Sequence, residues 1–281
     1  MGVCLREGVP YIVTLHDFWA FCFHLHLYPG TGVDYCRDSA GGRKCAPCFL
    51  TAAQGGLTCE SSDLREAARY IKIRRQMILR YLQRAACLTA PSHFVRNRFL
   101  VEWKELKNHI RVVPNDVDMV PARQTSTRPR RQTKRIGFLG GLAEVKGLHV
   151  LLQAMEQLPD PPVLRLYGAG RTDYSRWMKS AGYEGLLKRT VQIGGIFDPC
   201  RLSGVLAEVD AVVIPSFVET FSLVALESLK AGKMVIASRT AALQEWIKDG
   251  VNGNLFRPGD FRELAAVIRQ WMKREPVSKF L

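Results

Sequence analysis

The chain lacks any apolar run that approaches the roughly 20 residues of a membrane-spanning helix. Its first residues, Met1 to Glu7, also lack the apolar core of a signal peptide. With eight Cys in 281 residues, these absences favour a reducing, cytoplasmic compartment over a disulfide scaffold. There is neither a zinc finger of proper spacing nor an RNP-like aromatic stretch, so we expect no nucleic-acid partner. No strand precedes a full G-x-G-x-x-G pattern followed by an acidic residue, which disfavours an NAD-binding dehydrogenase.

Positive charge is abundant and unevenly placed. The chain has 40 Lys and Arg against 26 Asp and Glu, a net charge of +14. Residues 118–135 hold six basic residues against Asp118 alone, and we interpret this stretch as a basic linker. On the expected helix Ser61–Arg84, the residues Arg65, Arg69, Lys72 and Gln76 share one face. The alternatives are an ordinary solvated surface and a surface that attracts anionic lipid, including a lipid-phosphate acceptor.

From residue 135 onward, strand-like and helix-like segments alternate, which predicts a parallel sheet with helices on both faces. We expect strands at 136–139, 163–167, 191–193, 211–214, 234–237 and 254–256, and helices at 148–158, 174–181, 201–208, 221–229, 243–248 and 261–272. Ligands of such sheets lie at the carboxyl ends of the strands. We therefore assign 136–281 to a nucleotide-binding Rossmann-like domain.

Residues 1–117 predict only half of a second Rossmann-like domain. Strands are expected at 11–15, 87–90 and 110–113, and helices at 61–84 and 94–103. The Cys- and Gly-rich segment from Phe18 to about Gly56 is expected to be irregular. Three strands are few for such a domain, so the first domain is expected to be incomplete and the chain to be a fragment.

The stretch from Asp210 to Glu227 carries the strongest functional signal. The apolar run 211–214 indicates a buried parallel strand, and the expected helix after it aims the N–H groups of Thr220, Phe221, Ser222 and Leu223 at a helix N-terminus. Such an end binds phosphate. Glu219 and Glu227 flank it, as suits hydroxyl groups on either side of a diphosphate. The alternative is an ordinary strand-to-helix turn with one solvated and one partly buried Glu.

Five motifs in the same order resemble those of family-4 glycosyltransferases, which have the GT-B fold. They are Thr14-Leu-His-Asp-Phe-Trp19, Val113-Pro-Asn-Asp-Val-Asp118, Phe138-Leu-Gly-Gly-Leu-Ala-Glu-Val-Lys-Gly147, Leu166-Tyr-Gly-Ala-Gly170, and Glu219-x7-Glu227 followed by Ala231-Gly232-Lys233. The resemblance covers nearly the whole chain. It implies a retaining transferase, without a metal or other cofactor, that moves a sugar from a nucleotide-diphosphate sugar to a hydroxyl of a glycan or lipid-linked glycan.

The resemblance also implies roles for single residues. Lys146, with Gly140 and Gly141, would hold the diphosphate, and Glu227 would accept hydrogen bonds from the ribose hydroxyls. Glu219 would contact the transferred sugar, and His16 the sugar or the diphosphate. His16 also has a structural alternative, a turn in which Asp17 caps its own backbone. Gly141 departs from the family, which usually has Arg there, so one diphosphate contact is expected to be missing.

Two alternative functions stay open. The chain is an inactive or binding-only fragment that holds donor nucleotide, or it is a nucleotide-sugar epimerase of related fold. A separate question concerns four clustered cysteines, Cys22, Cys36, Cys45 and Cys48, of which the last two form a Cys-x-x-Cys pair. Their spacing fits no compact zinc module, so they are either partly buried thiols or ligands of a structural zinc.

Overall fold

The computed structural model describes residues 1–30, 35–37, 39–54, 61–117 and 134–274, and it contains two compact units. The first consists of Met1–Asn115 with the short stretch Val218–Phe221, and the second of Asp116–Phe217 and Ser222–Leu281. The expected basic linker at 118–135 lies outside the described residues except for Lys134 and Arg135. Both units are built on parallel sheets, which confirms the α/β fold class.

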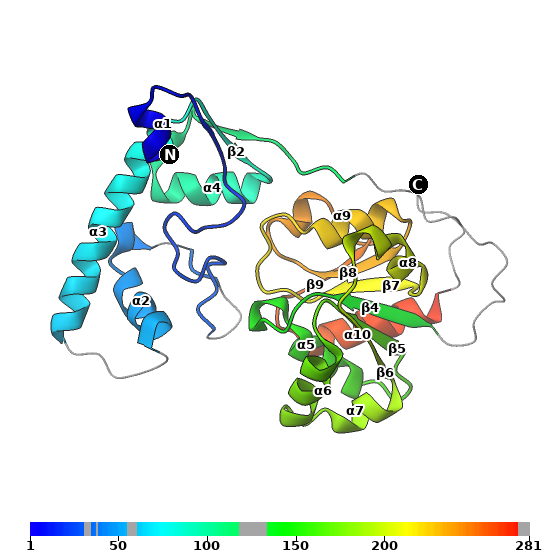
Figure 1. The fold of residues 1–281 in the computed structure, drawn as a ribbon. Helices are drawn as coiled ribbons and strands as arrows, with labels where there is room; N and C mark the ends of the chain where they lie inside the picture. The colour runs from blue at the N-terminus through cyan, green and yellow to red at the C-terminus, as the bar shows by residue number, and fades with distance from the viewer. Residues whose placement is uncertain (31–34, 38, 55–60, 118–133, 275–281) are drawn as a thin grey trace. The chain divides into compact units, whose positions relative to one another are not determined.

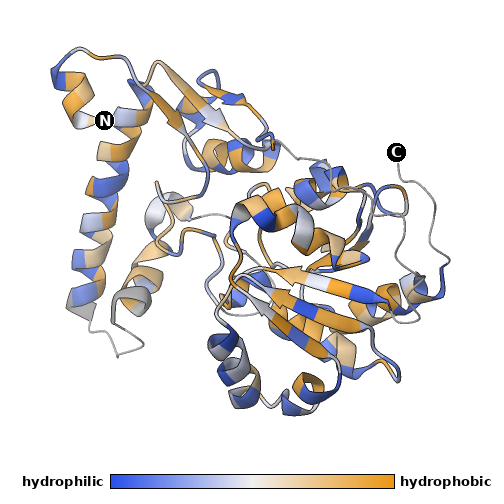
Figure 2. Cartoon of the chain, turned by 45° about the vertical axis from the view of Figure 1, so that its right-hand side comes forward, coloured by the Kyte–Doolittle hydropathy of each residue, from blue (hydrophilic) through white to orange (hydrophobic). Residues whose placement is uncertain are grey.

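The second unit has a six-stranded sheet with the order β6-β5-β4-β7-β8-β9. Its strands are β4 Arg135–Leu139, β5 Val163–Tyr167, β6 Val191–Gly195, β7 Ala211–Ile214, β8 Met234–Ser238 and β9 Asn254–Phe256. All strand pairs are parallel. Every residue of β7 is buried, as its unbroken apolar sequence predicts. Figure 2 shows the sheet as a largely hydrophobic layer.

Helices cover both faces of this sheet (Figure 1), as the alternating pattern predicts. They are α5 Leu148–Glu156, α6 Arg171–Ser180, α7 Glu184–Arg189, α8 Leu202–Ala207, α9 Leu223–Lys230 and α10 Phe261–Lys273. The last of them begins at Asp260, whose side chain accepts hydrogen bonds from the N–H groups of Arg262 and Glu263 at 3.1 and 2.9 Å. Lys134 caps its other end by donating to the carbonyl of Trp271.

Four expectations for the second unit were wrong. The helix expected at 174–181 begins already at Arg171. The helix expected at 243–248 is a single 3₁₀ turn, Leu243–Glu245, because Asn252 bonds the backbone of Lys248 and Trp246 and turns the chain away. The helix expected at 221–229 begins only at Leu223. Helix α7 was not expected, since its six residues are too few to show a period.

The first unit has a three-stranded parallel sheet with the order β1-β2-β3, namely Ile12–Thr14, Cys87–Ala90 and Ile110–Val112. Its helices are α1 Gly2–Arg6, α2 Cys45–Gln54, α3 Ser61–Gln83 and α4 His93–Glu102. The segment expected to be irregular therefore contains a helix, α2, which packs on α3 through Ala46, Leu50 and Ile71. This tertiary contact compensates for the weak helical signal of a Cys- and Gly-rich stretch.

Aromatic rings form a second core in the first unit. Phe18 and Phe21 are fully buried, and Phe21 meets Phe99 and Trp103 edge-on, with ring centroids 5.1 and 5.6 Å apart. These contacts attach the chain that follows β1 to helix α4. Helix α3 turns Ile71, Ile78 and Leu82 inward, as expected. It also turns Arg74 and Arg75 inward, whereas the expected face of Arg65, Arg69, Lys72 and Gln76 is exposed.

Candidate functional site

The strand order of the second unit predicts a ligand crevice beside β4. The chain runs outward from β4 through β5 to β6, then returns to the other side of β4 with β7 and continues to β8 and β9. The order reverses at β4, so the loops after β4 and β7 leave the sheet in opposite directions, and ligands of such sheets bind at this point of the carboxyl edge. Gly140, Gly141 and Lys146 belong to the first of these loops. Glu227 lies on α9, the helix that follows the second.

The turn after β4 is held in place by a buried tyrosine. Gly140 donates its N–H to the carbonyl of Tyr167 at 2.8 Å, which ties this turn to the end of β5. The hydroxyl of Tyr174 donates to the carbonyl of Gly140 and also contacts that of Tyr167 at 2.9 Å. Tyr174 is fully buried, and this burial raises its pKa, so the phenol stays a donor at neutral pH. Sequence reasoning missed this residue, because Tyr174 only marked the start of an expected helix.

Two glycines permit the close approach of these turns. A Cβ on Gly168 would lie 2.8 Å from the Gly140 carbonyl oxygen, and a Cβ on Gly147 would lie 2.0 Å from the carbonyl oxygen of Pro215. Gly147 also has a φ of +69°, in the left-handed region that favours glycine. Gly141 differs, because a Cβ there would meet nothing within 4 Å. The site therefore has room for a longer side chain at this position, where the family usually has Arg.

The loops after β4 and β7 are also joined directly. Phe217 donates its N–H to the carbonyl of Val145 at 2.9 Å, and its ring stacks on His149, with centroids 5.6 Å apart. Burial lowers the pKa of His149, so its ring stays uncharged in this stack at neutral pH. Lys146 lies between these contacts, half-buried, with its aliphatic stem 3.9 Å from the place of a Gly140 Cβ. Its position beside the crevice is thus set by backbone contacts on both sides.

Helix α9 presents an N-terminus to the same edge of the sheet, two residues later than expected. Ser222 is its N-cap, with a φ of +71°, and its hydroxyl accepts from the N–H of Ala225. Leu223 and Val224 therefore contribute first-turn N–H groups, and Thr220 and Phe221 belong to the preceding loop. The N-terminal pole of α9 favours an anion here.

The two glutamates differ in their surroundings. Glu227 is half-buried on α9, and burial raises its pKa above the ordinary value of a glutamate. Glu219 is buried in the stretch Val218–Phe221, which belongs to the first unit by its contacts. His16 is exposed directly after β1, also in the first unit. Asp17 accepts the N–H of Trp19 at 2.7 Å, so the turn expected at His16-Asp17 is present.

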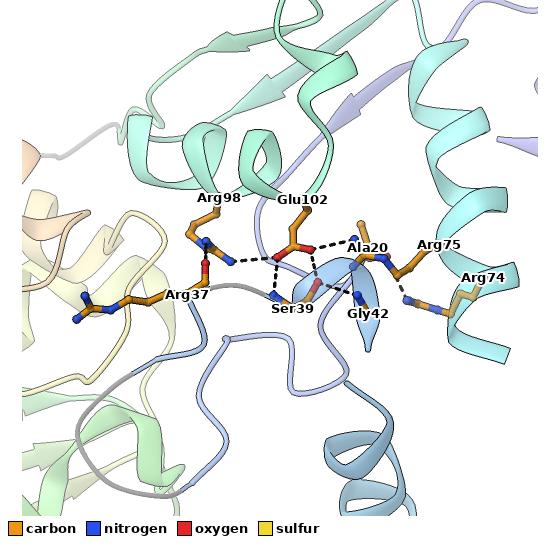
Figure 3. Close-up of polar contacts among 8 residues, drawn as sticks. All are labelled: Ala20, Arg37, Ser39, Gly42, Arg74, Arg75, Arg98 and Glu102. Atoms are coloured by element: carbon orange, nitrogen blue, oxygen red, sulfur yellow. Dashed lines mark hydrogen bonds and ion pairs between the residues drawn. The ribbon is translucent and has the colours of Figure 1, made fainter. Parts of the chain in front are cut away.

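A buried ionic network lies in the first unit (Figure 3), and sequence reasoning missed it entirely. The Glu102 carboxylate, 1% exposed, bonds Arg75 at 2.9 Å and Arg98 at 3.3 Å, and it accepts from both the N–H and the hydroxyl of Ser39. Glu102 and Arg98 lie on α4, Arg75 on α3, and Ser39 before α2. Arg75 and Ser39 are distant in sequence from α4, so the spacing of residues gave no sign of this network.

Comparison with known proteins assigns the family. The profile described as "Glycosyl transferases group 1" matches residues 133–274, which include the whole described sheet of the second unit. The chain belongs to the group 1 glycosyl transferases. Its membership confirms the expected resemblance to family-4 enzymes. The matched region contains Gly140, Lys146 and Glu227, so the crevice beside β4 lies in the part of the chain that defines the family.

Similar group 1 proteins carry several activities. A glycogen synthase of Mycobacterium tuberculosis (strain CDC 1551 / Oshkosh) is 30% identical over 161 residues, which cover 57% of this chain and 39% of that protein. A D-inositol 3-phosphate glycosyltransferase of Corynebacterium jeikeium is 36% identical over 165 residues, covering 52% and 39%. The chain thus spans about two fifths of the length of these relatives.

Solved structures show the same fold. Anabaena Alr3699/HepE, in complex with UDP and glucose, has a TM-score of 0.64 at 20% identity, over 96% of this chain and 64% of that one. Sucrose-phosphate synthase from Thermosynechococcus elongatus has a TM-score of 0.65 at 22% identity, over 96% and 61%. Both confirm the GT-B type of this group 1 glycosyl transferase. Among the described residues, no helix combines the length and apolar character needed to cross a membrane.

Proposed function

We propose that this protein transfers a sugar from a nucleotide-diphosphate sugar to a hydroxyl of a glycan or lipid-linked glycan. The observation that carries the proposal is the crevice beside β4, where Lys146 and the N-terminus of α9 lie at the carboxyl edge of one sheet. An ammonium and a helix N-terminus supply the positive charge that a diphosphate requires. The proposal takes UDP as the first donor nucleotide to test, since UDP is bound in the HepE structure.

The chemistry follows from where charge develops. When the bond between sugar and diphosphate breaks, negative charge grows on the leaving phosphate oxygen, and fixed donors stabilise that charge. Lys146 and the first-turn N–H groups of α9 are preorganised for this, since the contacts of Gly140, Gly147 and Phe217 hold both loops. Glu227 would accept hydrogen bonds from the ribose hydroxyls. Glu219 would contact the transferred sugar, and His16 would contact the sugar or the diphosphate. Retention of configuration and metal independence are what the family resemblance implies.

Binding and turnover separate the main alternatives. Thermal unfolding is measured with UDP, UDP-glucose, GDP and ADP, and a ligand at 100 times its Kd stabilises by about 2.7 kcal/mol. Stabilisation by one nucleoside diphosphate and its sugar supports the donor site, and none from any of them overturns it. Sugar transfer to added acceptor glycans then tests the activity. Binding without transfer would support the binding-only alternative, and conversion of the bound sugar without acceptor would support an epimerase.

We also propose that this protein is cytoplasmic and binds the inner face of the cytoplasmic membrane. Helix α3 exposes Arg65, Arg69 and Lys72, and it exposes the large apolar side chains of Tyr70, Ile73 and Met77. Basic residues beside exposed apolar ones favour an anionic lipid surface. Co-sedimentation with anionic and neutral vesicles tests this. We expect binding to anionic vesicles only, weakened by salt and by Arg69→Glu, and unchanged by Arg269→Glu on α10.

A further inference from the structure

Four cysteines from three separate stretches of the chain surround one cavity in the first unit. The cavity has a volume of about 40 Å³, enough for a small ion or a water molecule. Cys22 follows β1, Cys36 lies fourteen positions later, and Cys45 and Cys48 begin helix α2. The spacing of the four cysteines in the sequence fits no compact zinc module. Only the tertiary structure brings all four to one cavity.

Each of the four is placed by backbone structure. Cys45 and Cys48, three positions apart in the first turn of α2, are neighbours on the helix surface. Cys22 donates its N–H to the carbonyl of Phe18 at 2.7 Å, and Cys36 donates its own to Leu27 at 2.7 Å. Cys22, Cys36 and Cys48 line the same cavity. The cavity therefore has a sulfur-bearing residue on several sides.

The ionic network of Glu102 holds this cavity together. Ser39 and Glu102 both line it, and Ser39 lies between Cys36 and Cys45 in sequence. The hydrogen bonds from Ser39 to Glu102 attach the chain between Cys36 and Cys45 to helix α4. Arg75, on α3, bonds the same carboxylate. Lys44 also lines the cavity and supplies a positive charge near it. A negatively charged metal–thiolate group would thus have a compensating cation at hand.

We propose that Cys22, Cys36, Cys45 and Cys48 bind one zinc ion and so join the segment after β1 to helix α2. Zinc takes four thiolates in a tetrahedron, with zinc–sulfur distances of about 2.3 Å. Each thiol loses its proton to solvent as it binds, so four Zn–S bonds form and four protons are released. Among the described residues, no three His, Cys, Asp or Glu side chains already have the separations of a metal site. The proposal therefore requires the sulfurs to turn into the cavity by rotation about χ1 when the ion binds.

The role of such an ion would be structural. Four protein ligands leave zinc no open position for substrate, as is typical of structural sites. Within the described parts of the segment from Cys22 to Cys48, the regular elements are the 3₁₀ turn Ala40–Gly42 and the start of α2. Zinc bound at both ends and in the middle of this segment would cross-link it. The cross-link would add to the anchors that the segment already has, the buried ring of Phe21 at its start and the bonds of Ser39 to Glu102.

The test measures metal on the full-length chain. After purification with zinc in the medium and extensive dialysis, zinc is counted by mass spectrometry, and we expect about one equivalent per chain. Cys45→Ser and Cys48→Ser should each lose at least ninety per cent of it. The matched controls are Cys87→Ser on β2 and Cys200→Ser in the second unit, neither of which lines the cavity. Both controls should retain the full equivalent.

A second measurement on the unaltered chain keeps the test independent of folding defects. Cobalt exchanged for zinc should show the thiolate-to-cobalt charge-transfer band and the intense d–d bands of tetrahedral sulfur coordination. X-ray absorption should give four sulfur neighbours at about 2.3 Å from zinc. The proposal is overturned by a chain that binds no zinc, by iron with inorganic sulfide, or by disulfides among the four cysteines. It is also overturned if zinc is lost in His24→Ala and retained in Cys22→Ser, since His24 lines the same cavity.

Discussion

Replacing Glu227 by Gln should stabilise the protein and weaken its binding of nucleotide. Burial raises the pKa of Glu227, because the half-buried carboxylate loses hydration on α9. A raised carboxyl pKa means that the fold favours the protonated form. The stabilisation that the protonated Glu227 carboxyl contributes is complete below its pKa in the unfolded chain. It is lost as the pH rises through its higher pKa in the folded chain. At neutral pH the ionised Glu227 therefore costs stability, and the isosteric, uncharged Gln removes that cost.

The same change should weaken binding of UDP by about 2 kcal/mol. Hydrogen bonds to a charged group contribute about 1 kcal/mol more than those between neutral groups, and the ribose offers two hydroxyls. A loss of about 2 kcal/mol corresponds to a roughly 30-fold increase in Kd. Calorimetric titration with UDP measures this without any sugar. Thermal unfolding between pH 4 and 8 measures stability, and the variant should gain most at neutral pH and converge with the unaltered chain at low pH.

Glu184→Gln provides the matched control. Glu184 is exposed on α7, and its pair with Lys188, at 3.0 Å, lowers its pKa. The ionised Glu184 therefore stabilises the fold. This stabilisation is present above the carboxyl pKa of the unfolded chain and is lost as the pH falls through the lower pKa of the folded chain, so Glu184→Gln should lose a little stability at neutral pH. Its affinity for UDP should not change. An unchanged affinity for UDP in a folded Glu227→Gln chain would refute the assignment of Glu227 to the ribose.

Three further predictions concern the loops and the ionic network. Lys146→Ala should weaken binding of UDP far more than that of uridine, because the ammonium serves the diphosphate; equal losses in calorimetry would make Lys146 a structural residue. Gly147→Ala should destabilise by more than the roughly 1–2 kcal/mol of a left-handed residue, because its Cβ would clash with the Pro215 carbonyl, and chemical denaturation measures this. Glu102→Ala should destabilise by about 3–5 kcal/mol, since it leaves two buried arginines uncompensated. A loss in Glu102→Ala no larger than that of an exposed pair, below about 1 kcal/mol, would contradict the buried network.

The sequence predicted the architecture of the second unit well, because each element there carries its own pattern. The strands Val163–Tyr167, Ala211–Ile214 and Asn254–Phe256 were predicted to the residue, since apolar runs bounded by turn residues mark buried parallel strands. The predicted helices were wrong where a tertiary contact overrides the local sequence pattern. Helix α2 forms in a Cys- and Gly-rich stretch because α3 packs on it, and the helix expected at 243–248 yields to the hydrogen bonds of Asn252.

For the candidate site, the sequence by itself predicted which residues would carry the chemistry, and it fixed their order along the chain. Lys146, Glu219 and Glu227 stood out because motif spacing is a local property. Only the tertiary structure decided how they are supported. The phenol of Tyr174, the contact of Gly147 with Pro215 and the ring of His149 on Phe217 join segments up to about 70 positions apart. The Glu102 network and the convergence of four cysteines on one cavity have the same origin, because a one-dimensional pattern does not specify which distant side chains meet in a packed interior.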